Sequence, residues 1–294
     1  MTKLLIFPSS INQINETLDL TDGYILSIRD LSVNSPFYID IDSLEQIVIK
    51  LKQRQKQIFV SLNKNMFNSD LENLKEVLLK INKLHINGVF YYDLSVLSLV
   101  KKLSLDINLV WSQEHMTTNY LTCNYYNEKG VKYVYLSSEI TLKEIIEITE
   151  KTDILTIIPI FGYLPMFNSK RHIVKNYLET FNINDNSKIN YIEKENKKYP
   201  IIDEKNGTTV YSSNIMCGLD EYLILKDHID YVTLNSFNID NNKFQEVIKC
   251  FKEINENNKQ RLSEKINKMF NNIDKGFLYK ETIYRVKKDE KRSN

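Results

Sequence analysis

Polar residues that could carry chemistry follow three short apolar segments between residues 87 and 139. Asp93 follows VFYY, the sequence SQEH at residues 112–115 follows INLVW, and SSE at residues 137–139 follows VKYVYL. If each apolar segment is a parallel strand, all three clusters lie at the same face, where α/β proteins place their active sites. We therefore expect Asp93, Ser112 and Glu139 to contact a ligand there.

The second cluster contains a candidate acid–base pair, Glu114 and His115. A carboxylate and an imidazole just beyond a strand can exchange protons with a bound substrate. We predict that these two residues are catalytic. The alternative is that they form the solvated start of an ordinary loop.

Cationic side chains elsewhere predict a site for a small dianion. Ser169, Lys170 and Arg171 precede the helical pattern HIVKNYLETF, and a helix N-terminus beside basic residues can bind a carboxylate or phosphate. Arg29 follows the second predicted strand and could bind a carboxylate bidentately, while Asn63 ends the third. We expect all five to bind the ligand, although each is individually typical of a cap or rim residue.

The hydrophobic periodicity predicts alternating strands and helices. Strands are expected at residues 3–7, 24–28, 57–62, 89–92, 107–111, 132–136, 155–160 and 231–234, and helices at 42–53, 69–84, 94–103, 118–129 and 141–152. Ser69 and Thr141 stand at predicted helix N-caps. This alternation favours a (β/α)8 TIM-type barrel, complete or distorted, over a doubly wound open sheet.

The remaining segments predict the domain organisation. A barrel is expected over residues 1–240, with a long polar insertion at about 165–229 and a C-terminal helical extension with a basic tail at 241–294. Within the insertion, YPIIDEKNGTTVYSS predicts a β-hairpin that turns at Asn206-Gly207.

Composition excludes several classes of protein. The net charge of +1 over 294 residues is too small for a strongly basic nucleic-acid binder. The apolar runs are too short for a membrane span or a signal peptide, so we expect a cytoplasmic protein without a membrane partner. Cys123, Cys217 and Cys250 are too far apart for a metal knuckle and are expected to be free thiols. The motifs of P-loop, dinucleotide-binding, zincin and serine-hydrolase proteins do not occur.

Four sequence blocks carry a family resemblance between about residues 59 and 284. They read WSQEHMTTNYLTCNYYNEKGVKYVYLSSEITLKEI, GYLPMFNSKRHIVKNYLE, NGTTVYSSNIMCGLDEY and IDKGFLYKETIY. In order and spacing they resemble the collagenase-like peptidase family, peptidase family U32. They are most similar to its shorter bacterial members, which are linked to hydroxylation of the wobble uridine of tRNA.

This resemblance implies a TIM-type barrel that takes part in 5-hydroxylation of the wobble uridine, with tRNA as partner and prephenate as a required metabolite. One alternative is a non-catalytic tRNA-binding subunit that pairs with a larger paralogue as a hetero-oligomer. A second alternative is the collagenase-like peptidase activity of the family label. We favour hydroxylation over peptidase activity because the sequence contains no identifiable arrangement of nucleophile and base.

The resemblance also bears on cofactors. Many family members hold an iron–sulfur cluster with cysteines around the block that reads FGYLPMFNSKRH in this chain. Pro165 and His172 stand where relatives often have Cys, and Cys217 alone matches a family cysteine. A single thiolate does not hold a four-iron cluster. We therefore expect this chain to bind neither a cluster nor another metal. Either a partner subunit carries the metal, or this chain has a role in substrate delivery.

Overall fold

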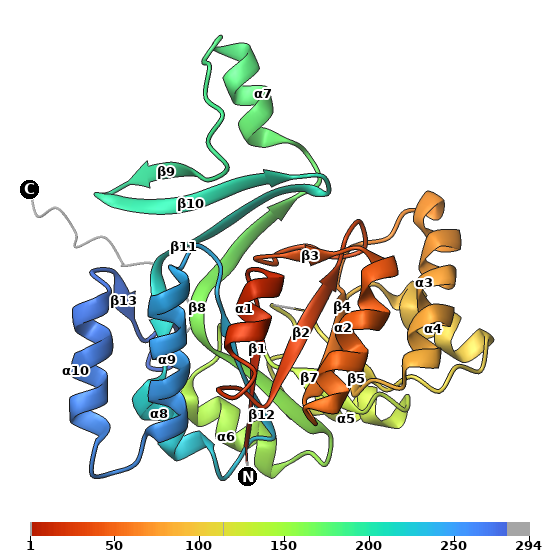
Figure 1. The fold of residues 1–294 in the computed structure, drawn as a ribbon, viewed down its shortest axis with the longest axis horizontal. Coiled ribbons are helices and arrows are strands. Elements are labelled where there is room, and N and C mark those ends of the chain that lie inside the picture. The colour runs from red at the N-terminus through yellow and green to blue at the C-terminus, as the bar shows by residue number, and fades with distance from the viewer. Residues whose placement is uncertain (1, 114, 281–294) are drawn as a thin grey trace, which may run out of the picture.

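Eight parallel strands close into a barrel in the computed structural model, which describes residues 2–113 and 115–280 (Figure 1). The barrel closes because β8 pairs with both β7 and β12, and β12 pairs with β1. The barrel strands are β1 (Lys3–Phe7), β2 (Gly23–Ile28), β4 (Gln57–Leu62), β5 (Gly88–Tyr91), β6 (Leu109–Trp111), β7 (Tyr133–Tyr135), β8 (Leu155–Ser169) and β12 (Tyr231–Asn235). The predicted (β/α)8 fold is confirmed, and the open sheet is excluded.

Helices connect the strands and cover the outside of the barrel. They are α1 (Ile11–Glu16), α2 (Ile41–Gln53), α3 (Leu71–Leu84), α4 (Leu94–Lys102), α5 (Tyr120–Glu128), α6 (Leu142–Glu150), α8 (Leu219–Leu225) and α9 (Asn241–Glu253). Thr141 caps α6 as predicted, in a reciprocal capping box with Glu144. The prediction for Ser69 was wrong. It lies inside the 3-10 helix η1 (Asn68–Asp70), and Asp70 is the N-cap of α3.

One buried side chain from each of the eight strands fills the barrel interior. This layer consists of Leu5, Ile25, Phe59, Phe90, Val110, Tyr133, Ile157 and Tyr231. Phe59 lies at its centre, with its ring centroid 5.8 Å from that of Phe90, 5.4 Å from that of Tyr133 and 5.5 Å from that of Tyr231, all edge to face. The barrel is therefore closed by a packed core, and a ligand must bind at its end.

Strand β8 is much longer than the predicted segment 155–160, because it belongs both to the barrel and to an antiparallel extension of the same sheet, which we call the second sheet. Its first half belongs to the barrel, and from Phe161 onward it pairs antiparallel with β11 (Gly207–Cys217). Gly162 marks the change, with a φ of +126° and so little room that a Cβ would lie 2.7 Å from the Asn235 carbonyl oxygen. Since the pairing partner lies about 50 residues away, local periodicity could not predict the extension.

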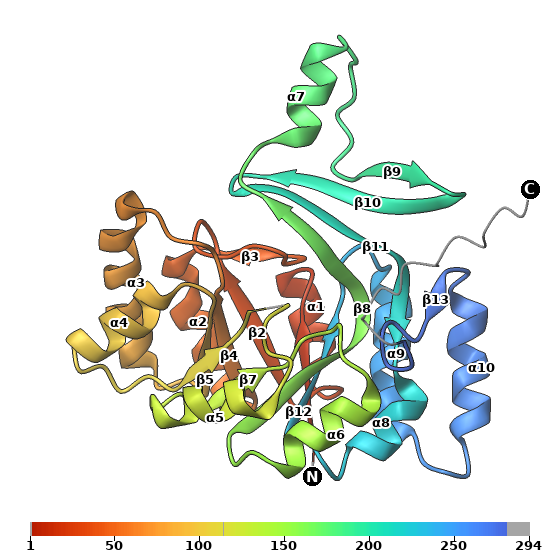
Figure 2. The same ribbon diagram turned by 180° about the vertical axis from the view of Figure 1, so that it is seen from behind.

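The second sheet continues from β11 to β10 (Lys197–Glu204) and β9 (Asn190–Lys194), all antiparallel. With α7 (Ile173–Thr180), it projects beyond the carboxyl ends of the barrel strands (Figures 1 and 2). We call residues 166–198 the arm. The predicted hairpin is confirmed, but its turn lies one residue earlier than the predicted Asn206-Gly207. Lys205 and Asn206 form its tip, and Gly207 begins β11 with a φ of +125°.

The C-terminal part packs beside the barrel. It adds α10 (Lys259–Met269) and β13 (Ile273–Asp274), which pairs with β11, while the short strand β3 (Tyr38–Ile39) pairs with β2. The ring of Phe161 contacts Phe244 and Phe251 of α9 and Phe270 after α10. Within the described ranges, every helix is too short or too polar to cross a membrane.

Candidate functional site

A cavity of about 500 Å³ lies at the carboxyl ends of the barrel strands, which is the end to which the arm is attached. We call it the mouth cavity. Its lining comes from the loops after β2, β4, β5 and β6, from the end of β8 and from the hairpin. It includes Asn34, Asn63, Lys64, Phe67, Tyr92, Gln113, His115, Asn168, Ser169, Lys170, Glu204, Lys205, Asn206 and Thr209. A smaller cavity of about 50 Å³ reaches into the barrel end and shares Asn34 and Asn63 with it. The volume of the mouth cavity suits a small-molecule ligand.

The hairpin tip forms one wall of the mouth cavity because polar contacts hold it against the loop after β2. Lys205 forms an ion pair with Asp30 at 2.9 Å, and the Asn206 side-chain amide donates to the Ser32 carbonyl at 3.0 Å. The Tyr38 hydroxyl donates a hydrogen bond to the Glu204 carboxylate. These contacts join the second sheet to the barrel across the cavity.

Burial changes the pKa of Glu204 in this wall. Desolvation raises it, and the hydrogen bond from Tyr38 opposes that shift without cancelling it. The pKa of Tyr38 is also raised, first by desolvation and then by the neighbouring Glu204 charge. Glu204 is thus a carboxyl group at the cavity that holds its proton to higher pH than an exposed glutamate.

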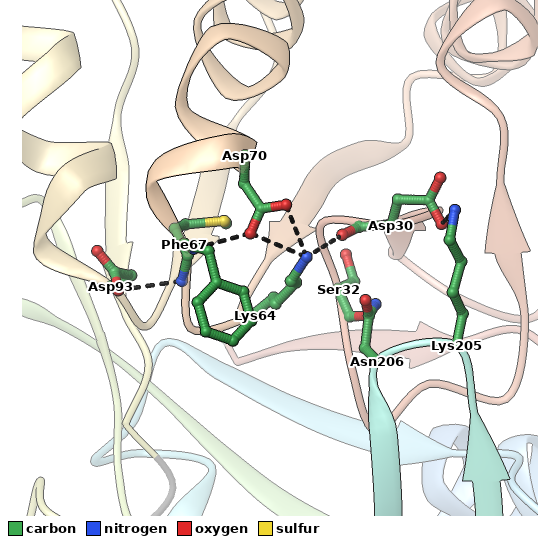
Figure 3. A network of polar contacts seen from close by, with 9 residues as sticks. Asp30, Ser32, Lys64, Phe67, Asp70, Asp93, Lys205 and Asn206 are labelled. Carbon is green, nitrogen blue, oxygen red and sulfur yellow. Dashed lines mark hydrogen bonds and ion pairs between the residues drawn. The ribbon is translucent and has the colours of Figure 1, made fainter. Parts of the chain in front are cut away.

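Lys64 is the most enclosed of the lysines that line the mouth cavity. Figure 3 shows the polar contacts around its ammonium group. Its ammonium group lies 3.0 Å from the Asp70 carboxylate and 3.1 Å from the Asp30 carbonyl oxygen, with exposed side-chain fractions of 12% for Lys64 and 20% for Asp70. Desolvation opposes ionisation of Asp70, but hydrogen bonds from the Phe67 N–H and from Lys64 outweigh it and lower the pKa. The network fixes the loop that carries Phe67.

The Phe67 ring in turn contacts Lys170 from the start of the arm. The Lys170 ammonium lies 3.7 Å from the ring centroid, within cation–π range. An aromatic face and a cation are thereby adjacent on the cavity wall. This combination can bind a ligand that has both a ring and a negative charge.

His115 is positioned by Glu139. Its Nδ1 lies 3.3 Å from a Glu139 carboxylate oxygen, and both side chains are about 40% exposed. When Nδ1–H faces the carboxylate, Nε2 remains to exchange a proton with a ligand. His115 lines the mouth cavity. Glu114, its predicted catalytic partner, lies outside the described residues, and the structure instead places Glu139 beside the imidazole.

The structure brings several other predicted residues to this end of the barrel. Asn63, Ser169 and Lys170 line the mouth cavity, and Ser112 lines the smaller one. Asp93 has a structural role: its carboxylate accepts the Ser95 N–H at 2.9 Å as the N-cap of α4 and the Met66 N–H at 3.1 Å. Two separate strand connections are thereby joined at the site.

The predicted shared anion site of Arg29, Lys170 and Arg171 is not formed. Arg29 donates from Nε to Asp40 at 2.6 Å and does not line the mouth cavity, and neither does Arg171. The N-terminus of α7 is already bonded within the chain, since Asp203 accepts the Val174 and Lys175 N–H groups. A carboxylate about 30 residues away thus takes the place that the sequence pattern predicted for an external anion.

Sequence reasoning missed much of the hairpin side of the site. Phe67, Tyr92 and Glu204 line the cavity but carry no motif, and the residues of the tip were predicted as a turn without a role. The Asn206-Gly207 dipeptide was the one available signal, because a tight turn there places neighbouring side chains at a fixed point. It does not reveal which loop the tip contacts.

The three cysteines do not form a ligand set for an iron–sulfur cluster. They lie buried in separate elements, Cys123 in α5, Cys217 at the end of β11 and Cys250 in α9. Burial raises the pKa of each thiol, to about 12 for Cys123 and Cys217, whereas a cluster ligand must be a thiolate. Within residues 2–113 and 115–280, no group of three or more His, Cys, Asp or Glu could hold a metal ion.

Comparison with known proteins supports a relationship beyond the fold. The chain is 30% identical over 274 residues to the tRNA hydroxylation protein P2 of Bacillus subtilis, covering 83% of this chain and 85% of that protein. It is 33% identical over 95 residues to the uncharacterized protease MJ0090 of Methanocaldococcus jannaschii, covering 32% of this chain and 23% of that protein.

Among solved structures, the U32 peptidase Mk0906 has a similar fold. The TM-score is 0.52 at 14% identity, covering 80% of this chain and 92% of that chain. The sequence model of peptidase family U32 matches residues 21–288, which is most of the chain. Together with the barrel and its mouth cavity, this match shows that the chain is a member of peptidase family U32.

Proposed function

We propose that this protein takes part in hydroxylation of tRNA, at C5 of the wobble uridine. The observation that carries the proposal is the identity to the tRNA hydroxylation protein P2 over most of both chains. The geometry is consistent with this role, since the mouth cavity combines a ring, cations and a positioned imidazole.

The mouth cavity is the proposed site of a small dianionic metabolite such as prephenate. Among the described residues, three lysines, Lys64, Lys170 and Lys205, line it together with one carboxylate, Glu204, whose pKa is raised. Lys64 and Lys205 are engaged in ion pairs, so Lys170 is the cation best placed to meet a ligand carboxylate. The neighbouring Phe67 ring offers a face to the unsaturated ring of the metabolite.

The site also limits what this chain does in the reaction. Hydroxylation at C5 replaces a C–H bond with a C–O bond and is an oxidation, so it requires an oxidant. We propose that a partner subunit supplies it, and that His115, oriented by Glu139, accepts or returns protons. The alternative of a non-catalytic tRNA-binding subunit differs in that the mouth cavity would bind no metabolite.

Peptidase activity receives less support. The thiols of Cys123, Cys217 and Cys250 are buried with raised pKa values, so they are poor nucleophiles. A gelatin digestion assay with and without chelator tests this alternative directly, and digestion that depends on this chain would favour it.

Mass spectrometry of tRNA tests the proposed role. We expect deletion of the gene, in a strain without a redundant hydroxylation route, to remove 5-hydroxyuridine-derived nucleosides from the wobble position. The intact gene should restore them. An unchanged nucleoside profile in the deletion strain would refute the proposal.

Calorimetric titration of the purified chain tests the metabolite site separately. Prephenate should bind, and Lys170→Ala should weaken binding about tenfold, because one charge-assisted contact is lost. Lys143→Ala, which removes an exposed lysine from α6, is the control and should bind as the wild type does. Equal affinity of the two variants would exclude the proposed role of Lys170, and absence of binding would favour the non-catalytic subunit.

A further inference from the structure

The arm stands away from the barrel on the side of the mouth cavity (Figures 1 and 2). Its base is held firmly by the antiparallel pairing of β8, β11, β10 and β9. The first turn of α7 is hydrogen-bonded to this sheet. The Thr208 hydroxyl accepts the Ile173 N–H at 2.8 Å, and the Asp203 carboxylate accepts the N–H groups of Val174 and Lys175. The arm is therefore a positioned element and presents its side chains in a defined arrangement.

Helix α7 exposes apolar side chains that have no cover within the described part of the chain. None of its eight residues is buried. Ile173 and Tyr177 of α7 and Phe181, its C-cap residue, follow one another at intervals of four and are 38%, 56% and 61% exposed. The rings of Tyr177 and Phe181 lie 4.8 Å apart, and Tyr191 on β9 is 50% exposed. Such a short helix gains little stability alone, so an exposed aromatic face of this kind indicates a binding surface.

The charge of the arm indicates which kind of ligand it binds. Residues 166–198 contain seven Lys and Arg against four Asp and Glu, a net charge of +3, whereas the whole chain has a net charge of +1. The basic residues are Lys170, Arg171, Lys175, Lys188, Lys194, Lys197 and Lys198. Flat aromatic side chains among cations match a ligand with unpaired bases and phosphates, since bases stack on aromatic rings and phosphates attract lysines.

The arm also lies in the right place for such a ligand. Ser169 and Lys170 line the mouth cavity, and α7 begins three residues after Lys170. An RNA strand that lies along the arm is therefore adjacent to the mouth cavity.

We propose that the arm is the docking surface for tRNA, and that unpaired loop bases stack on Tyr177, Phe181 and Tyr191 while lysines bind the phosphates. This inference rests on the proposed function for the identity of the RNA. A protein partner would favour a surface of low charge.

Fluorescence anisotropy with unmodified tRNA and with an isolated anticodon stem–loop tests the docking surface. The double variant Tyr177→Ala/Phe181→Ala should bind about tenfold or more weakly than the wild type, because each stacked base contributes substantially. Both side chains are exposed, so the fold should not change. The matched control is Leu121→Ala/Tyr125→Ala, an exposed pair at the same spacing on α5, which should bind normally.

The contribution of the lysines is tested by the dependence of tRNA affinity on salt concentration. Lys175→Glu/Lys188→Glu should weaken binding and reduce the slope of log affinity against log salt by about one per lost phosphate contact. A stem–loop should compete better than a blunt duplex of equal charge, because only the loop offers unstacked bases.

Several results would overturn the inference. These are tRNA binding that is equal in the arm and control variants, no tRNA binding by the wild type, and an aromatic variant that loses only self-association or association with another protein. Failure of the docking surface is distinguishable from failure of the proposed function. If deletion removes the modified nucleoside while arm variants bind tRNA normally, only the docking surface is wrong. If arm variants lose tRNA binding while deletion leaves the nucleoside unchanged, only the hydroxylation role is wrong.

Discussion

Replacement of Lys64 by methionine tests whether the ion pair with Asp70 holds the loop at the mouth cavity. Methionine keeps the length of the side chain but removes the charge, and leaves Asp70 with the Phe67 N–H as its remaining donor. The exposed fractions of 12% and 20% place the pair between a surface pair, worth less than about 1 kcal/mol, and a buried one, whose disruption costs about 3–5 kcal/mol. We expect the variant to lose about 1–2 kcal/mol of unfolding free energy.

Urea denaturation at two pH values measures this loss. Because the pKa of Asp70 is lowered in the folded protein, its contribution is fully present above its ordinary pKa of 3.8 and is lost as the pH falls through the lower folded value. The difference between wild type and Lys64→Met should therefore be largest at pH 7 and shrink at pH 3.

The variant Asp70→Asn and the double variant complete a cycle that isolates the interaction of the pair. We expect the double variant to be more stable than the sum of the single losses indicates, since removal of both charges leaves neither uncompensated. Additive losses, or a difference of the same size at pH 3 and pH 7, would show that the reasoning about this pair is incorrect.

Three further predictions concern the barrel core and the hairpin. Phe59→Ala should cost about 3–5 kcal/mol in urea denaturation, because it empties the centre of the barrel interior; a loss under about 1 kcal/mol would contradict the packed interior. The contribution of Glu204 to the free energy of unfolding should be full below its ordinary pKa of 4.5 and should decrease as the pH rises through its raised pKa in the folded protein. Glu204→Gln should therefore flatten the pH profile of thermal unfolding in that range. Identical profiles of the variant and the wild type would count against burial of this carboxyl. Gly207→Ala should increase proteolytic cleavage near the hairpin tip, because φ is +125° and the new Cβ would lie 1.9 Å from the Ser169 carbonyl oxygen; unchanged cleavage would contradict this.

Local pattern was sufficient for much of the barrel. Strands such as β4 and β12 and helices such as α2 lie within a few residues of their predicted positions, since each depends on periodicity within its own segment. The polar clusters after β5, β6 and β7 also reach the predicted end of the barrel, because parallel strands share one direction.

Family membership was also evident in the sequence itself, because the four blocks resemble the family in order and spacing, and the family's sequence model matches residues 21–288. Tertiary structure decided which of the predicted side chains lie together at the site and which hairpin residues join them. Asp203 bonds the start of α7, Asp40 binds Arg29, and the hairpin tip packs on the loop after β2. Each of these contacts joins elements that are brought together by the closed barrel and the second sheet.

The physical reason is the difference between local and non-local interactions. The choice between helix and strand depends on residues within a few positions of each other, and so can be read from a short window of sequence. An anion site depends on whether a competing carboxylate or carbonyl oxygen reaches the same cation or N–H group first. That competition is settled by chain segments far apart in sequence, as Asp203 and Lys175 illustrate.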